Sequence, residues 1–97
     1  MLIPNRPIHP GEVLREEYLE PLGMTAYGLA KALHTTRPRI EELVRERRSM
    51  TADMAHRLAV FFKTTPQFWM NLQANCDLLK AEHESKDAYN GIAPLQA

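Results

Sequence analysis

Four threonines, each placed just before a stretch of apolar residues at helical spacing, constrain what this chain can fold into. Threonine is a common cap of a helix, because its hydroxyl accepts a hydrogen bond from a free backbone N–H of the first turn. The four are Thr25, Thr36, Thr51 and Thr65. No segment alternates apolar and polar residues between hairpin turns, as a half-buried strand would. The sequence therefore predicts an all-α fold.

We expect five helices. The first begins near Pro10, because proline suits a first helical turn, and it is stopped by Pro21 and Gly23. The next three begin at the first three threonine caps, and the fourth helix ends near Lys63. The last helix starts at Pro66, and its periodicity is lost after residue 84.

The composition fits one small domain and excludes several classes of protein. The chain has 97 residues, and about 100 residues support a single core. Twelve basic and twelve acidic residues give a net charge of zero, so an argument for nucleic acid must rest on where the charges lie. The single Cys76 and the absence of a secretion signal predict a cytoplasmic location. No apolar run approaches the roughly 20 residues that span a bilayer, so we expect no membrane partner.

The segment from Thr36 to Arg48 has the layout of a DNA-reading element. Ile40, Leu43 and Val44 form an i, i+3, i+4 stripe that must face a core, which leaves the opposite side chains free to face a groove. A short helix precedes this one, and only a few residues join the two. Such a pair is typical of a helix-turn-helix.

The residue types in this element predict two kinds of DNA contact. Arginine can bind guanine through two hydrogen bonds and glutamate can accept one from cytosine, so we expect Arg37, Arg39 and Glu42 to specify sequence. The residues expected to contact phosphate are Thr25, Thr36, Arg45, Arg47 and Arg48. Residues 37–48 hold five arginines and three glutamates, a local charge of only +2. We therefore expect firm binding to require a dimer with two such helices about 34 Å apart.

A second apolar stripe lies on the last predicted helix. It consists of Trp69, Leu72, Cys76 and Leu79. This heptad-like spacing is typical of helices that pack against a partner helix, so we predict that the stripe forms a homodimer interface. Residues 1–86 are then a single domain for DNA binding and dimerisation. Residues 87–97 are expected to be a flexible tail, because Asn90-Gly91 and Pro94 interrupt helices.

Several segments resemble known DNA-binding regulators. Residues 28–40, Gly-Leu-Ala-Lys-Ala-Leu-His-Thr-Thr-Arg-Pro-Arg-Ile, resemble the helix-turn-helix of phage-repressor-like (XRE-type) regulators. More narrowly, the chain resembles HigA-type antitoxins over about residues 8 to 80. That resemblance is carried by His9-Pro10-Gly11-Glu12-Val13-Leu14 with Glu16-Glu17, by Ile40 to Met50 leading into Thr51-Ala52-Asp53, and by Pro66-Gln67-Phe68-Trp69-Met70-Asn71-Leu72-Gln73.

The resemblance implies a five-helix phage-repressor-like domain with an extended C-terminal helix. It also implies a dimeric antitoxin that neutralises a HigB-like, mRNA-cleaving ribonuclease toxin and binds double-stranded operator DNA to repress its own operon. Carried over by position, Thr36 is the helix-capping residue, Arg39 and Glu42 face the groove, and Arg47-Arg48 match a basic pair after the reading helix.

Three residues depart from the pattern of the resembled family. His34 stands where the turn usually has a glycine, which implies a left-handed backbone that histidine tolerates less well. Glu41 replaces a small polar residue and Glu46 replaces the usual C-terminal glycine, and both add negative charge where phosphates should lie.

Other functions fit the residues less well. The four histidines lie far apart and only one cysteine is present, so we expect no metal site. No nucleophile or phosphate-binding loop accompanies them, so we expect neither a cofactor nor an enzyme. Two alternatives stay open: a stand-alone XRE-type regulator without a toxin, and a protein-interaction module that has lost DNA binding through Glu41 and Glu46.

Overall fold

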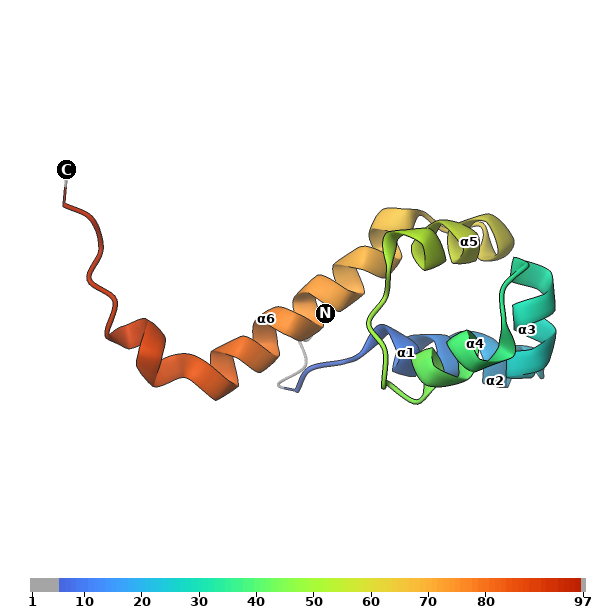
Figure 1. Ribbon diagram of the computed structural model, residues 1–97, viewed down its shortest axis with the longest axis horizontal. Coiled ribbons are helices and arrows are strands. Elements are labelled where there is room, and N and C mark those ends of the chain that lie inside the picture. The colour runs from blue at the N-terminus through green and yellow to red at the C-terminus, as the bar shows by residue number, and fades with distance from the viewer. Residues whose placement is uncertain (1–5, 97) are drawn as a thin grey trace.

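The computed structural model describes residues 6–96, and every regular element within them is helical. The first three elements follow one another without a break and form one helical segment: α1 (Pro10–Val13), η1 (Leu14–Leu19) and α2 (Glu20–Leu22). The other four are α3 (Ala26–Leu33), α4 (Arg37–Val44), α5 (Ala52–Phe62) and α6 (Pro66–Asn90). The prediction of an all-α fold with five helical segments is confirmed. Figure 1 shows α1 to α5 gathered at one end of the molecule, with α6 leaving them as an arm.

The first segment contains a wide turn that the sequence pattern does not predict. Residues 14–19 form a π-helix, in which the Glu20 backbone N–H bonds to the Arg15 carbonyl, five residues back. Pro21 follows directly, and a proline inside a helix has no N–H to donate and its ring crowds the carbonyl four residues earlier. Widening the preceding turn relieves that crowding, so the helix passes through Pro21 and ends at Leu22.

The predicted threonine caps begin the later helices. The hydroxyls of Thr25, Thr51 and Thr65 each accept a hydrogen bond from the backbone N–H three residues ahead. Thr36 occupies the same position before α4 with an extended backbone, but its hydroxyl makes no such bond. Local capping therefore explains three of the four helix starts.

One hydrophobic core receives side chains from every helical segment. The completely buried residues include Leu14, Leu29, Ile40, Leu58 and Trp69. Three aromatic rings join the first segment to the last two helices, since the Tyr18 ring centroid lies 4.7 Å from that of Phe62 and 5.2 Å from that of Trp69. In this core, side chains of α3 and α4 pack together with those of the first helical segment, α5 and α6.

The second half of α6 and the residues after it leave this core. The described chain measures 53 × 28 × 25 Å, and the long dimension includes the arm drawn in orange to red in Figure 1. We expected helical structure to end near Glu84, but α6 continues to Asn90 with a kink at Ser85, where φ is −128°. Residues 87–90 are therefore helical, and the predicted stop at Asn90-Gly91 is where the helix ends. No helix among residues 6–96 combines the length and apolar character needed to cross a membrane.

Candidate nucleic-acid interface

The helices α3 and α4 form a helix-turn-helix, and the turn between them is short. His34 adopts the left-handed conformation, with φ 57° and ψ 45°, as expected for a residue in the usual glycine position. The N–H of Thr35 then bonds back to the Ala30 carbonyl at 3.0 Å, which closes the end of α3. Thr36 is extended and starts α4. The turn therefore consists of only three residues between two helices of eight residues each.

The reading helix α4 is fixed from its inner side. Ile40 and Leu43 are buried and Val44 is half-buried against the core, as the predicted stripe requires. At Gly11, in α1, an added Cβ would lie 1.9 Å from the carbonyl oxygen of Leu43. The backbones of α1 and α4 are therefore in direct contact, which leaves α4 little freedom to shift.

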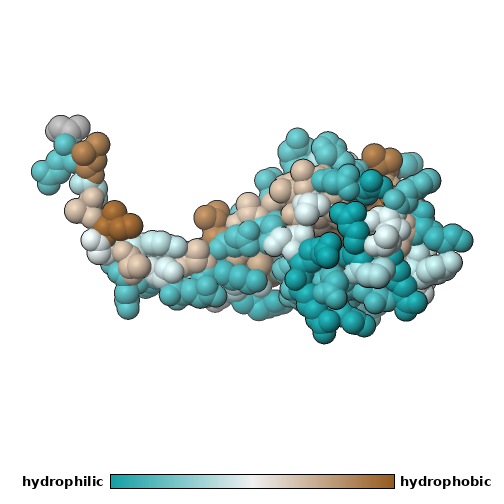
Figure 2. All heavy atoms as spheres, viewed as in Figure 1, coloured by the Kyte–Doolittle hydropathy of each residue, from teal (hydrophilic) through white to brown (hydrophobic). Residues whose placement is uncertain are grey.

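The residues predicted to contact DNA lie mostly on the exposed side of this element. Arg37, Arg45, Arg47 and Arg48 are exposed, and Arg39 and Glu42 are half-buried. Both threonines are exposed at the starts of their helices, Thr25 before α3 and Thr36 before α4. In the view of Figure 2, mainly hydrophilic side chains cover the region where α1 and α4 lie in Figure 1.

Ion pairs distribute the charges of the element in a way that the sequence did not reveal. Arg37 Nε lies 2.5 Å from a Glu41 oxygen, and Arg47 Nη1 lies 3.8 Å from a Glu42 oxygen. Glu46, with φ 63°, lies 3.3 Å from Nη2 of Arg15 on the first helical segment. All three glutamates of the element are thus paired with arginines.

The remaining arginines of the element keep their charge free for a ligand. Within residues 6–96, no ion pair involves Arg39, Arg45 or Arg48. Arg39 Nη1 lies 3.4 Å from the hydroxyl of Thr35, which is neutral. The element therefore presents three arginines outside any ion pair of the described residues. Because Glu41 and Glu46 are paired with arginines, they repel phosphate less than the sequence alone suggests.

Arg57, which is not among the residues expected from the sequence to form the interface, supports the turn from α5. Its Nη1 donates to the Leu33 carbonyl at 2.8 Å and to the His34 carbonyl at 3.0 Å, while its Nε donates to Asp53 at 2.8 Å. The last carbonyls of a helix have no partner within the helix, so a cation here satisfies them and complements the helix dipole. Arg57 thus fixes the end of α3 at the point where the turn begins.

Two further side chains hold the segment that follows α4. Arg15 donates to the Val44 carbonyl at the end of α4. Gln73, buried in α6, accepts a hydrogen bond from the Met50 N–H at 2.7 Å and donates to Asp77 at 2.9 Å. The basic residues between Val44 and Met50 are therefore carried on a backbone that is anchored at both ends.

The predicted dimer stripe packs largely inside the single chain. Trp69 and Cys76 are 0% and 1% exposed, and the Trp69 Nε1–H donates to the Thr64 hydroxyl at 2.8 Å. Leu72 and Leu79 are half-buried, and Leu72 packs against the core. Trp69 and Cys76 thus offer no surface to a second copy, because their own chain already covers them. Burial also raises the pKa of the Cys76 thiol, which keeps it protonated.

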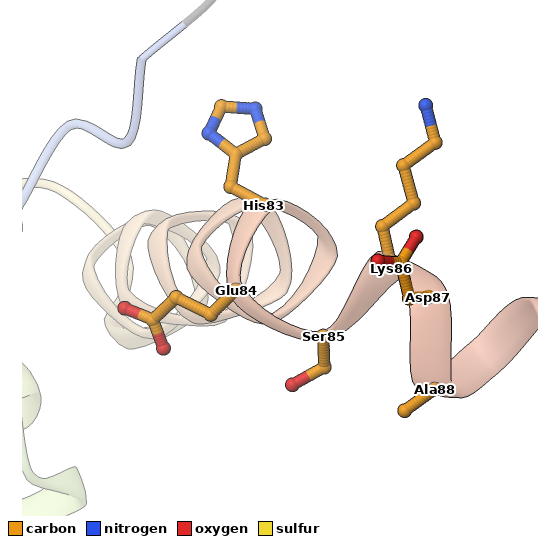
Figure 3. Close-up of a pocket in the computed structure, with 6 residues that line it drawn as sticks. All are labelled: His83, Glu84, Ser85, Lys86, Asp87 and Ala88. Carbon is orange, nitrogen blue, oxygen red and sulfur yellow. The ribbon is translucent and has the colours of Figure 1, made fainter.

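Two hollows lie on the surface of the described residues. One, of about 370 Å³, lies at the kink of α6 and is lined by residues 83–88 alone. Figure 3 shows His83 and Lys86 extending from one side of this helix and Ser85 from the other, so the side chains do not converge. Another, of about 320 Å³, lies between the end of α3 and α5. Within the described residues, no three potential metal ligands come together.

Comparison with known proteins identifies the family. No protein-family model matches the chain. Virulence-associated protein I of Dichelobacter nodosus is 53% identical over 91% of this chain and 81% of its own length. Antitoxin HigA-1 of Vibrio cholerae is 34% identical over 93% of this chain and 85% of its own length. The structure of Pseudomonas aeruginosa antitoxin HigA with the higBA promoter is 44% identical, with a TM-score of 0.88 over 94% of this chain and 100% of that one. The chain belongs to the HigA antitoxin family.

The HigA resemblance predicted from the sequence is thereby confirmed, together with the fold that it implied. The relatives in this family are antitoxins and helix-turn-helix transcriptional regulators, not enzymes. 

Two of the three segments that carry the HigA resemblance, those beginning at His9 and at Pro66, have structural roles. His9 is buried and accepts a hydrogen bond from the Gly11 N–H at 2.8 Å, while Gly11 permits the close approach to Leu43. In the second motif, Trp69 fills the core and Gln73 anchors Met50. These HigA motifs position the reading helix and do not themselves lie on its exposed face.

Proposed function

We propose that this chain is the antitoxin of a HigB–HigA-like toxin–antitoxin module, acting in the cytoplasm. In this proposal it neutralises a ribonuclease toxin and binds operator DNA as a dimer, which represses its own operon. The observation that carries the DNA half is a rigidly supported helix-turn-helix whose exposed side presents Arg39, Arg45 and Arg48 without acidic partners. Its relative from Pseudomonas aeruginosa was solved with promoter DNA, which supports the same ligand here.

In this proposal α4 enters the major groove and its first turns read base edges. Arg37, Arg39 and Glu42 are the proposed base contacts, because guanine accepts two hydrogen bonds from an arginine and cytosine donates one to a carboxylate. Thr36, just before this helix, is a proposed phosphate contact, because its hydroxyl is not engaged in capping the helix.

The remaining candidates contact the phosphate backbone. Arg45, Arg47 and Arg48 follow the reading helix and are exposed. Thr25 accepts the Gly28 N–H at 3.0 Å, which leaves its hydroxyl proton available for a phosphate oxygen. Such contacts set the position of the protein on the duplex and do not specify sequence.

A dimer doubles these charges and matches a symmetric operator. Because Trp69 and Cys76 are covered within the protomer, we propose that the second copy packs on the outer side of α6, where Leu72 and Leu79 are half-buried and Leu78 is 69% exposed. Replacing Leu79 with glutamate is expected to lower the apparent mass in sedimentation while circular dichroism stays helical. A dimer that persists at unchanged mass would move the interface elsewhere.

The DNA half is tested with a fluorescent duplex of the promoter of the chain's own gene. We expect the wild type to bind it at least about 1,000-fold more tightly than unrelated DNA, the lower end for specific binding. The double variant R39A/R48A should lose most of that affinity, whereas K86A, a matched loss of charge on the arm, should keep it. If the double variant represses the promoter as well as the wild type, the DNA half is wrong.

The toxin half is tested on the neighbouring reading frame. If that frame encodes a ribonuclease, we expect the two proteins to purify together and growth arrest by the toxin to be relieved on co-expression. DNA binding without any toxin would favour the stand-alone regulator. Toxin neutralisation with no DNA binding would favour the interaction module.

A further inference from the structure

The ion pair between Arg37 and Glu41 joins the first residue of the reading helix to a residue one turn later. Arg37 Nε donates to Glu41 Oε1 at 2.5 Å, the shortest arginine–carboxylate contact in residues 6–96. The Arg37 side chain is 64% exposed, whereas that of Glu41 is only 28% exposed. The carboxylate is therefore the more fixed member of the pair, and the guanidinium is the member that reaches outward.

The atoms used in this contact determine what the arginine can still do. A guanidinium carries five N–H donors in one plane, and only the Nε edge faces Glu41. The two terminal nitrogens keep their outward N–H groups, which is the pair needed to bind O6 and N7 of guanine together. A carboxylate that holds the opposite edge fixes the plane of that pair before DNA arrives, so less side-chain freedom is lost on binding.

The other arginines of the element are not held in this way. Arg47 lies after the end of α4, and its closest acidic contact, to Glu42, is 3.8 Å. Arg39 has only the long contact to the Thr35 hydroxyl, at 3.4 Å. Among these arginines, Arg37 alone combines a place in the first helical turn with a short bond from Nε to a carboxylate.

We propose that Glu41 is a positioning residue that makes Arg37 selective for guanine, an inference that rests on the proposed operator binding. Glu41 itself does not contact the base. From the sequence alone, the negative charge of Glu41 counts against DNA binding. In the structure this charge orients Arg37 and is compensated by it.

The test measures discrimination base pair by base pair. The full chain is titrated onto the promoter duplex and onto a series of duplexes with one substituted pair each. The proteins compared are the wild type, E41Q, R37A and the control E46Q, which removes the same charge from a residue that pairs with Arg15 and not with Arg37. Thermal unfolding of each variant establishes that the fold is intact.

We expect one guanine in each half-site whose replacement weakens wild-type binding at least about tenfold, the scale of one bidentate contact. E41Q should bind the unaltered promoter within about threefold of the wild type, since removing a negative charge near phosphates offsets the lost orientation. At that guanine alone, discrimination by E41Q should fall to about threefold, and R37A should lose it. E46Q should discriminate as the wild type does.

The outcomes separate this inference from the proposed function. If the wild type selects its promoter but E41Q keeps full discrimination at every pair, or loses it equally at all pairs, Glu41 does not position Arg37. The same holds if R37A retains the guanine preference. If the wild type binds the promoter no better than unrelated DNA, operator binding itself is overturned and the inference with it.

Discussion

His9 is a titratable residue placed where a charge would be costly. It is 5% exposed and caps the start of α1, and its Nδ1 accepts the Gly11 N–H, which requires the neutral ring. Burial lowers its pKa below the ordinary 6.5, and the opposing effects of Glu46 and of a hydrogen bond to the Arg48 backbone are smaller. The first helical segment therefore begins at a residue that resists protonation.

This placement predicts a pH dependence of stability. Below about pH 6.5 the unfolded chain binds a proton at His9 that the folded chain excludes, so the free energy of unfolding falls as the pH drops. Above about pH 6.5 this contribution to stability is fully present. His9→Asn keeps a capping acceptor but does not titrate, so its stability should change less between pH 7.5 and 5 in urea titrations. Arg6 lowers the pKa of Glu12 through hydrogen bonds, so Glu12 loses its contribution only below about pH 4.5, outside this window. Parallel pH curves for wild type and variant would contradict the assignment.

Gly11 is required for contact between two backbones. A methyl group there would lie 1.9 Å from the Leu43 carbonyl oxygen, so Gly11→Ala must push α1 and α4 apart. We expect a loss of about 3 kcal/mol in the free energy of unfolding, the upper range for overpacking. Gly91→Ala is the control, because its nearest neighbour would lie at 3.5 Å and φ is −81°. Equal stabilities of the two variants in urea unfolding would show that the helices can separate without loss.

At the scale of the elements, the helix-turn-helix depends on residues that are distant in sequence. Arg57 closes the end of α3 from α5, and Arg15 closes the end of α4 from the first helical segment. Free carbonyls at a helix end are normally satisfied by a cap, by water or by such side chains. The turn is thus held by the domain and not only by its own three residues.

Removing Arg57 tests this dependence. Arg57→Ala leaves the Leu33 and His34 carbonyls without their donor. We expect the free energy of unfolding to fall by about 2 kcal/mol, which is typical of hydrogen bonds to charged groups. Because those carbonyls adjoin the turn, promoter affinity should fall as well, although we propose no DNA contact for Arg57. Lys86→Ala, which removes a cation far along the arm, serves as the control in both assays. An Arg57 variant with normal stability and normal DNA binding would refute the supporting role.

The same distances explain what the sequence could and could not predict. Caps and stripes are local patterns, so Thr25, Thr51 and Thr65 and the buried side of α4 were predicted correctly. Arg15, Arg57 and Gln73 bond to backbone groups 29, 24 and 23 residues away, and a backbone group has no residue type to recognise. The stripe at Trp69 was visible, but its spacing does not tell whether the same chain or a partner covers it.

At the scale of the whole molecule, the described chain is a compact head with a projecting arm. In Figure 2 the hydrophobic side chains on the visible face appear singly, several of them along the arm. Leu78, Tyr89, Ile92 and Leu95 are exposed on α6 and beyond it. Since the whole chain has no net charge, DNA binding cannot come from general attraction and must come from how many arginines the assembled protein brings to phosphates.

The salt dependence of promoter binding counts those arginines. If Arg45, Arg47 and Arg48 each neutralise one phosphate, a dimer makes about six contacts, and log Kd should rise with log salt with a slope near 5. Arg48→Ala removes one contact per protomer, so the slope should fall by about 2 for a bound dimer and by about 1 for a bound monomer. Lys86→Ala should leave the slope unchanged, which controls for net charge. The slopes are measured by fluorescence anisotropy between about 50 and 200 mM salt. If the slope is unchanged in Arg48→Ala, Arg48 does not contact a phosphate in the complex.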